Sequence, residues 1–230
     1  MPKRFVSRLI TAGVLCAALV ACSGEERSEP SPTPSPTLSG SAVDKAAVAE
    51  AFSSYREAVL AKDGKTVAAL LTAESLEYVA ATRKLALTAP ESCLRRARMS
   101  DQLAVIFLRT TVPAENIRSW STTQLVIHAV QRGQLNAAAV ERMSAGPVEV
   151  ADDLGTMSMK VDGQESGASL TFYRESGRWK FRLIPLLEAA ENALRARVEE
   201  QHITERRLVD QSLAATLSPE EVRAAWLPVG

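Results

Sequence analysis

The sequence predicts an α+β protein, in which several N-terminal helices precede a curved antiparallel meander and a C-terminal helical extension follows it. Changes in the hydrophobic pattern predict this order. Apolar residues recur at helical spacing from Ser41 to about Gly146, whereas they alternate with polar residues from Val148 to Leu183. After Pro185 the helical spacing returns. Helices kept apart from a run of consecutive strands are typical of the α+β class.

The first helices are predicted by their ends and by an apolar stripe. Ser41 is a favourable N-cap and Asp44 is an acidic residue in the first turn, so a helix is expected to begin there. The dipeptide Asp63-Gly64 predicts its end. A short helix is expected at 66–71 and another at about 73–87. The stripe of the first helix consists of Val48, Phe52, Tyr55 and Val59.

Residues 90–146 also predict helices. Ser100-Asp101 precedes the apolar segment QLAVIFLR, and Pro113 interrupts the pattern. Ser121 and Gln124 have the spacing of a capping box, in which each side chain accepts a hydrogen bond from the other residue's backbone amide. Gly133 predicts the end of that helix, and the segment NAAAVERM predicts a further one.

The meander is predicted by apolar residues at every second position, with turn sequences between the segments. Asp162-Gly163 begins one turn, and Glu175-Ser176-Gly177 makes another, with glycine where a positive φ is needed. The apolar face is expected to consist of Val148, Val150, Met157, Met159, Val161, Leu170, Phe172, Trp179, Phe181 and Leu183.

After Pro185 one long helix is expected at about 186–215, and Ser218-Pro219 predicts a last short helix. We expect 187–198 to pack on the sheet domain. Beyond that segment apolar residues become sparse, so 204–230 would gain little from burial and is expected to dock loosely or to serve a partner. In the alternative, this tail folds back and completes the core through Leu213, Leu217 and Trp226.

The N-terminus has the pattern of a secretory signal. A basic start precedes an apolar segment at 9–21, which is shorter than the ~20 residues that a membrane-spanning helix needs. The four residues Leu19-Val20-Ala21-Cys22 resemble the lipobox of bacterial lipoproteins. This resemblance implies that Cys22 becomes the acylated first residue and attaches the protein to the lipid bilayer. The alternatives are an uncleaved helical anchor and a signal peptide cut elsewhere.

The segment after Cys22 predicts a tether that ends at Ser41. Ser, Thr and Pro alternate from Ser28 to Gly40, so this segment cannot bury a core and is expected to stay extended. At ~3 Å per residue it could span roughly 60 Å. Ser23 is not the aspartate that resembles an inner-membrane retention signal. We therefore expect the outer membrane, facing the periplasm, in a diderm cell and the outer face of the plasma membrane in a monoderm cell.

Charge and cysteine content narrow the function classes. The chain holds 27 basic and 27 acidic residues, and three of the basic ones leave with the signal, so the mature chain is acidic. The sequence has no basic stripe with interleaved aromatic residues, so it does not predict nucleic-acid binding. Cys16 leaves with the signal, and the lone remaining thiol, Cys93, is expected to be a small buried side chain. We expect no disulfide, no metal site and no cofactor.

Two segments resemble one known fold family. The sequence EAFSSYREAVLAKDGKTVAALLTAESLEYV is similar to the opening helices of the nuclear-transport-factor-two-like, or ketosteroid-isomerase-like, fold, and VDGQESGASLTFYRESGRWKFRLIPLL resembles its closing strands. The resemblance implies that 42–185 form such a domain and that 186–230 are an added helical extension. It also implies a cone whose mouth can hold a hydrophobic ligand, where enzymes of the family place an acid or base with a tyrosine or histidine partner.

No set of residues predicts catalysis. His128 falls on the polar arc of its helix and is expected to be a solvated or capping histidine. His202 lies in a charged segment and is expected to be solvated. The paired carboxylates Asp152-Asp153 could act as acid and base, but a turn is the better interpretation. The candidate pocket-lining residues are Tyr55, Tyr78 and Trp179, although aromatic residues at such spacing more often form a core.

The first functional hypothesis is a non-catalytic, membrane-anchored module that binds a hydrophobic small molecule or an envelope protein. The alternative is an isomerase, dehydratase or cyclase of the ketosteroid-isomerase-like fold, and a third is a scaffolding role for the helix after Pro185. A buried ionisable residue inside an apolar pocket would favour the enzyme. A collapsed cone with an exposed apolar helix face would favour interaction.

Overall fold

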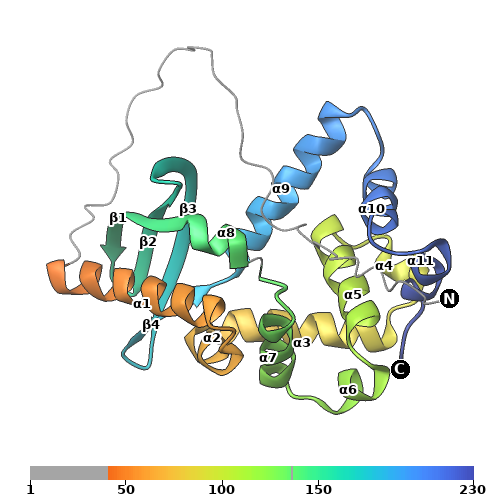
Figure 1. The fold of residues 1–230 in the computed structure, drawn as a ribbon, viewed down its shortest axis with the longest axis horizontal. Coiled ribbons are helices and arrows are strands. Elements are labelled where there is room, and N and C mark those ends of the chain that lie inside the picture. Colours follow the sequence, from red (N-terminus) through yellow and green to blue (C-terminus); the bar gives the residue numbers. More distant parts are fainter. Residues whose placement is uncertain (1–40, 136) are drawn as a thin grey trace, which may run out of the picture.

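The computed structural model describes residues 41–135 and 137–230. Over these residues the fold has the predicted α+β order: N-terminal helices, a four-stranded antiparallel open sheet, then C-terminal helices (Figure 1). The expected signal peptide, Cys22 and most of the tether lie outside the described residues. None of the described helices is long and apolar enough to cross a membrane.

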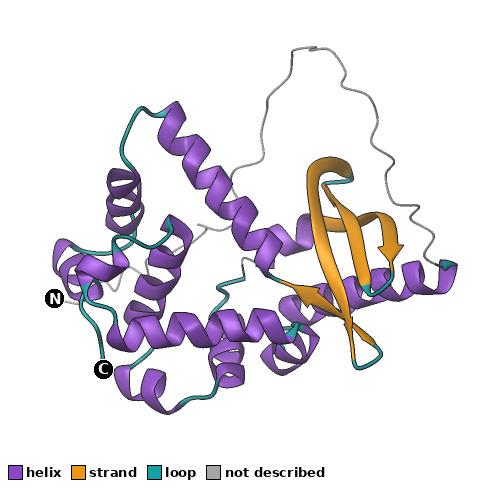
Figure 2. Ribbon diagram, turned by 180° about the vertical axis from the view of Figure 1, so that it is seen from behind, coloured by secondary structure: helices purple, strands orange, loops and turns teal. Residues whose placement is uncertain are grey.

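Helix α1 (Ala42–Leu60) lies along one face of the sheet (Figures 1 and 2). Ser41 caps it as expected, because its hydroxyl accepts a hydrogen bond of 3.1 Å from the Asp44 amide. Val48 and Phe52 are buried toward the sheet. The helix approaches strand β2 (Leu154–Val161) closely at Gly155, where an added Cβ would lie 2.7 Å from Val48 Cγ2.

Helix α1 ends at Leu60, shortly before the dipeptide Asp63-Gly64, as expected. Another helix, α2 (Gly64–Leu70), begins at Gly64. The Asp63 carboxylate accepts a hydrogen bond of 3.1 Å from the Thr66 amide and caps α2. Gly64 is needed for close packing, because an added Cβ would lie 2.5 Å from Ile127 Cα in α7 (Thr122–Gln131).

Strand β1 (Met143–Ala151), β2, β3 (Gln164–Glu175) and β4 (Arg178–Arg182) pair antiparallel in sequence order. Turns occur at Asp162-Gly163 and Ser176-Gly177, as predicted, and each has a positive φ at both central residues. Strand β1 begins earlier than the alternation at Val148 indicated. A register shift between Ala145 and Val148 interrupts its alternation, which concealed the first half of the strand.

The inner face of the sheet is the one predicted from the alternation. Phe172 lies opposite Phe181 across β3 and β4, with ring centroids 5.6 Å apart. Trp179 is 7% exposed and belongs to the same core. The opposite face carries Thr156, Thr171 and other polar residues, and no described helix crosses it in Figure 2.

The middle of the chain is helical, as predicted. Helix α3 (Ala73–Thr88) ends before Pro90, and the capping box of Ser121 and Gln124 at the start of α7 is present. Gly133 has a φ of 72° and follows the end of α7. The remaining helices are α4 (Glu91–Leu94), α5 (Met99–Thr111), α6 (Ala114–Ser119) and α8 (Ala137–Arg142).

The prediction of a single long helix at about 186–215 is wrong. The structure has two helices, α9 (Ile184–Glu200) and α10 (Glu205–Ala214). His202 adopts a left-handed φ of 49°, and the Ile203 amide donates back to the Val198 carbonyl at 3.2 Å, which ends α9. The Thr204 hydroxyl then accepts from the Arg207 amide and starts α10. The last helix, α11 (Pro219–Ala225), has the predicted cap at Ser218.

The buried apolar residues form two clusters. The sheet core combines the inner face of the sheet with buried residues of α1, α2, α7 and α8. The helical core combines residues of α3 to α7 with α10 and α11, among them Ile106, Leu125, Leu208 and Trp226. The C-terminal helices therefore pack on the middle helices of the chain, far from them in sequence.

The tail does not dock loosely, which corrects our expectation. Leu208, Leu213 and Trp226 are at most 6% exposed. The carbonyls at the end of α3 accept hydrogen bonds from the tail, from Val229 N at 3.3 Å and from Gly230 N at 3.0 Å. A helix end leaves carbonyls without partners, and the tail supplies donors for them. The alternative, in which the tail completes a core, is the observed arrangement.

Candidate functional site

The interior of the sheet, where the resemblance places a ligand, is occupied by side chains of the protein. Tyr55 on α1 lies with its ring centroid 4.8 Å from that of Phe181. Trp179 is buried beside Gly155, where an added Cβ would lie 3.3 Å from Trp179 Cζ3. Two of the three candidate pocket-lining residues, Tyr55 and Trp179, thus contribute to the sheet core.

Tyr78 lies elsewhere, between α3 and α5. Its hydroxyl donates to Asp101 Oδ1 at 3.0 Å. Arg98 holds the same carboxylate with two hydrogen bonds, of 2.9 Å from Nε and 3.1 Å from Nη2. The structure therefore does not bring Tyr78 together with Tyr55 and Trp179 in one site.

A second carboxylate, Glu191 of α9, reaches the same end of α5. It is 5% exposed, accepts a hydrogen bond of 2.9 Å from the Ser100 amide and pairs with Arg195 at 3.2 Å. The amides at a helix N-terminus have no partner within the helix, and Glu191 supplies one from another helix. We call the six residues Tyr78, Arg98, Ser100, Asp101, Glu191 and Arg195 the junction cluster.

The chemistry of the junction cluster is that of a structural network. Burial and the neighbouring Asp101 carboxylate raise the pKa of Tyr78 to about 12, so this phenol keeps its proton at neutral pH. Burial raises the pKa of Glu191, but hydrogen bonds from Ser100 and Arg195 outweigh it, and the pKa lies below its ordinary value. Neither group is suited to exchange a proton near pH 7.

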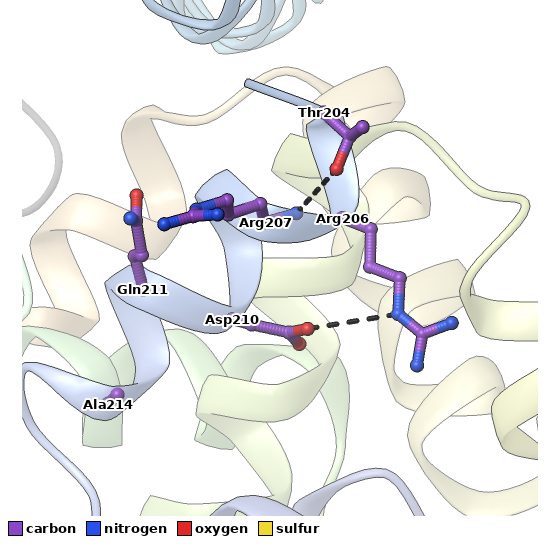
Figure 3. Close-up of a pocket in the computed structure, with 6 residues that line it drawn as sticks. All are labelled: Thr204, Arg206, Arg207, Asp210, Gln211 and Ala214. Atoms are coloured by element: carbon purple, nitrogen blue, oxygen red, sulfur yellow. Dashed lines mark hydrogen bonds and ion pairs between the residues drawn. The ribbon is translucent and has the colours of Figure 1, made fainter. Parts of the chain in front are cut away.

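Two shallow surface depressions stand out on the molecule. The first, of about 470 Å³, lies on the outer side of α10 and is lined by residues of that segment alone (Figure 3). In Figure 3 the Arg206 side chain reaches toward Asp210, with 3.8 Å between Nε and Oδ2. The second, of about 300 Å³, lies where α1 meets the start of β1. Neither depression lies in the sheet interior.

His128 is neither solvated nor a cap, which corrects our expectation. It is half-buried, its Nε2 atom is buried without a hydrogen-bond partner among the described residues, and its ring centroid lies 5.1 Å from that of Trp120. Trp120 comes just before the cap of α7, and its ring covers His128 on the otherwise exposed polar arc of that helix. His202 is exposed, as expected.

The remaining candidates lie on the surface. Asp152-Asp153 forms the exposed turn between β1 and β2, as expected, with a φ of 50° at Asp152. Cys93 is exposed, which corrects the prediction of a buried thiol. On the short helix α4 the neighbouring Leu94 is the buried residue, so Cys93 faces away from the core.

Sequence reasoning missed Arg109, which is 8% exposed and donates hydrogen bonds to four backbone carbonyls. Its spacing gave a signal, because Arg109 follows the buried Val105 by four residues and so shares its helix face. Across residues 41–135 and 137–230, no group of three or more His, Cys, Asp or Glu side chains could hold a metal ion.

No family model, no curated protein and no solved structure matches this chain.

Proposed function

We propose that this protein is a lipid-anchored bacterial envelope lipoprotein whose folded domain is a non-catalytic interaction module. The lipobox resemblance at Leu19-Val20-Ala21-Cys22 and the Ser/Thr/Pro-rich segment after it support the anchor and the tether. Of the two partners expected from the sequence, an envelope protein fits better than a hydrophobic small molecule. The reason is that the sheet interior holds the protein's own side chains.

The filled sheet core is the observation that carries the non-catalytic part of the proposal. Phe172 and Phe181 are at most 2% exposed, and they pack where the resembled fold would hold a ligand. The two buried charged residues among those described, Arg109 and Glu191, lie outside this core, and each binds backbone groups at the end of another helix. An enzyme of the resembled type needs an ionisable group that faces an enclosed apolar space.

The surface of the described residues fits a polar protein contact better than an apolar groove. The exposed large apolar residues are Val43, Tyr173 and Leu227, which lie on α1, on β3 and after α11. Single apolar residues on separate elements are ordinary for a folded surface. A partner would therefore bind mainly through polar and charged groups.

Acyl labelling in the native cell tests the anchor. We expect a clickable palmitate analogue to label the wild type, which stays in the membrane fraction. The Cys22→Ala variant should remain unlabelled and accumulate as uncleaved precursor, and Cys16→Ala is the control that should be labelled normally. Normal labelling of the Cys22→Ala variant would overturn the proposed anchor.

A further inference from the structure

The sheet core and the helical core meet along a boundary that contains both apolar and polar side chains. Helix α7 contributes Val126 and Val130 to the sheet core and Leu125 to the helical core, so it belongs to both. Helix α9 leaves the sheet after β4 and then packs on α5 and α3. Its buried Leu187 belongs to neither cluster. Its Leu186 packs against the sheet core, and its Leu194 and Val198 pack against the helical core, as partly buried residues. Helix α9 therefore contributes no buried residue to either cluster.

The junction cluster occupies the contact of α9 with α5. Glu191 lies one turn after Leu187 on the same face of α9 and binds the Ser100 amide of α5. Arg98 faces Glu191 from α5 and also binds Asp101, while Arg195 pairs with Glu191 from α9 itself. Tyr78 joins Asp101 from α3. Three helices are thus held at one point by hydrogen bonds and ion pairs.

The C-terminal tail has attachments of its own to the helical core. Leu208, Val209 and Leu213 of α10 are buried there, and Arg109 Nη1 donates to the Ala225 carbonyl of α11 at 3.2 Å. These contacts are made without α9, although α10 also contacts α9. Release of α9 would expose Leu194 and Val198, but the buried members of both clusters come from other elements and would stay in place.

We infer that the junction cluster fastens α9 to α5 between two separately cored parts of the domain, and that this contact opens while both cores remain folded. Segments with few apolar contacts and with exposed edges open at lower free energy than a core. Opening removes Leu187 from its buried position and frees the amide of Ser100. This inference is independent of the lipid anchor and of the identity of any partner.

Hydrogen exchange on the mature full-length protein tests the inference, with Glu191→Ala as the variant. Loss of a buried, charge-assisted hydrogen bond should raise the rate of local opening roughly ten- to hundredfold. We expect that increase at amides of 187–198 and of 100–103. Amides of Val48–Val59 in the sheet core and of Leu208–Leu213 in the helical core should exchange as in the wild type.

Glu188→Ala is the matched control, because Glu188 is an exposed glutamate on the same helix. It should leave all four segments unchanged. Tyr78→Phe removes a second bond of the cluster and should accelerate 100–103 in the same way. Equal acceleration of exchange in all four segments would show that the domain unfolds as one cooperative unit. Unchanged exchange in the Glu191→Ala variant would show that the junction cluster does not fasten α9 to α5. Either result would overturn the inference.

Discussion

Arg109 of α5 and Ala225 of α11 are joined by a hydrogen bond of 3.2 Å from Nη1 to the carbonyl oxygen. The same guanidinium donates to the carbonyls of Leu85, Ala86 and Ala89 at the end of α3. One side chain therefore supplies partners for the carbonyl ends of two helices that are distant in sequence. Burial lowers the pKa of Arg109, yet its charge suits the negative end of a helix dipole.

Arg109→Met should destabilise the domain by about 2–4 kcal/mol, because several buried carbonyls lose their donors at once. Urea unfolding at neutral pH measures the change. The control is Arg132→Met, at an exposed arginine after α7, which should change the stability by less than ~0.5 kcal/mol. Equal effects of the two substitutions would show that the carbonyls do not depend on Arg109.

Trp179→Ala should cost ~3–5 kcal/mol, as large-to-small changes in a core do. Trp179 is 7% exposed and lies among the sheet core residues. Chemical denaturation measures this loss, and Tyr173→Ala, at a 39% exposed position of β3, is the control on the other face. A loss below about 1 kcal/mol at Trp179 would mean that it does not face the core.

Gly155→Ala should destabilise by about 1–3 kcal/mol, because the new Cβ would lie 2.7 Å from Val48 Cγ2 and force α1 away from the sheet. Val48→Ala removes the opposing methyl groups. The double variant should therefore be more stable than the sum of the two single losses indicates. Additive losses would place the clash elsewhere.

His202→Gly should stabilise the protein by about 0.5–1 kcal/mol. His202 has a φ of 49° at the end of α9, a conformation that glycine adopts without steric cost. Lys62→Gly, with a φ of 56° after α1, should act in the same direction. Gly133→Ala makes the opposite substitution, from glycine to a residue with a Cβ, at a φ of 72° after α7, and should destabilise the protein. Thermal unfolding of the three variants compares them, and a loss of stability in both glycine variants would contradict this explanation.

Glu191 predicts an acid-dependent part of the stability. Its folded pKa lies below the ordinary 4.5, because the hydrogen bonds from Ser100 and Arg195 outweigh burial. Its contribution is therefore complete above the unfolded value and is lost as the pH falls through the folded value. The wild type should lose more stability than Glu191→Gln below about pH 4.5. Urea midpoints across that range would be parallel if Glu191 made no such contribution.

The sequence predicted those elements whose signals are local. The cap at Ser41, the capping box at Ser121 and the turn at Ser176-Gly177 each depend on neighbouring residues, and each occurs as predicted. The break after α9 was missed because residues other than glycine rarely take a left-handed φ and because the residues around Thr204 are compatible with a continuous helix.

Burial of polar residues was not predictable in the same way, because the partners come from distant segments. Trp120 covers His128, and the carbonyls of α3 and α11 receive Arg109. Of the three candidate pocket-lining residues, Tyr55 and Trp179 belong to the sheet core. Tyr78 instead has its partner, Asp101, on α5. Pairing across the fold decided each of these positions.

The most direct test of the filled sheet core is binding of a small apolar probe, indole, to a soluble form of the protein that starts at Ser23. Trp179→Ala should open a cavity beside the Arg174 guanidinium, whose Cζ lies 4.6 Å from the Trp179 ring centroid. Indole should refill this cavity and restore stability, since it supplies the lost ring. The unaltered domain should show no saturable binding by calorimetry and no thermal shift. Saturable binding at one site in the unaltered domain would contradict a filled core and reopen the ligand-binding alternative.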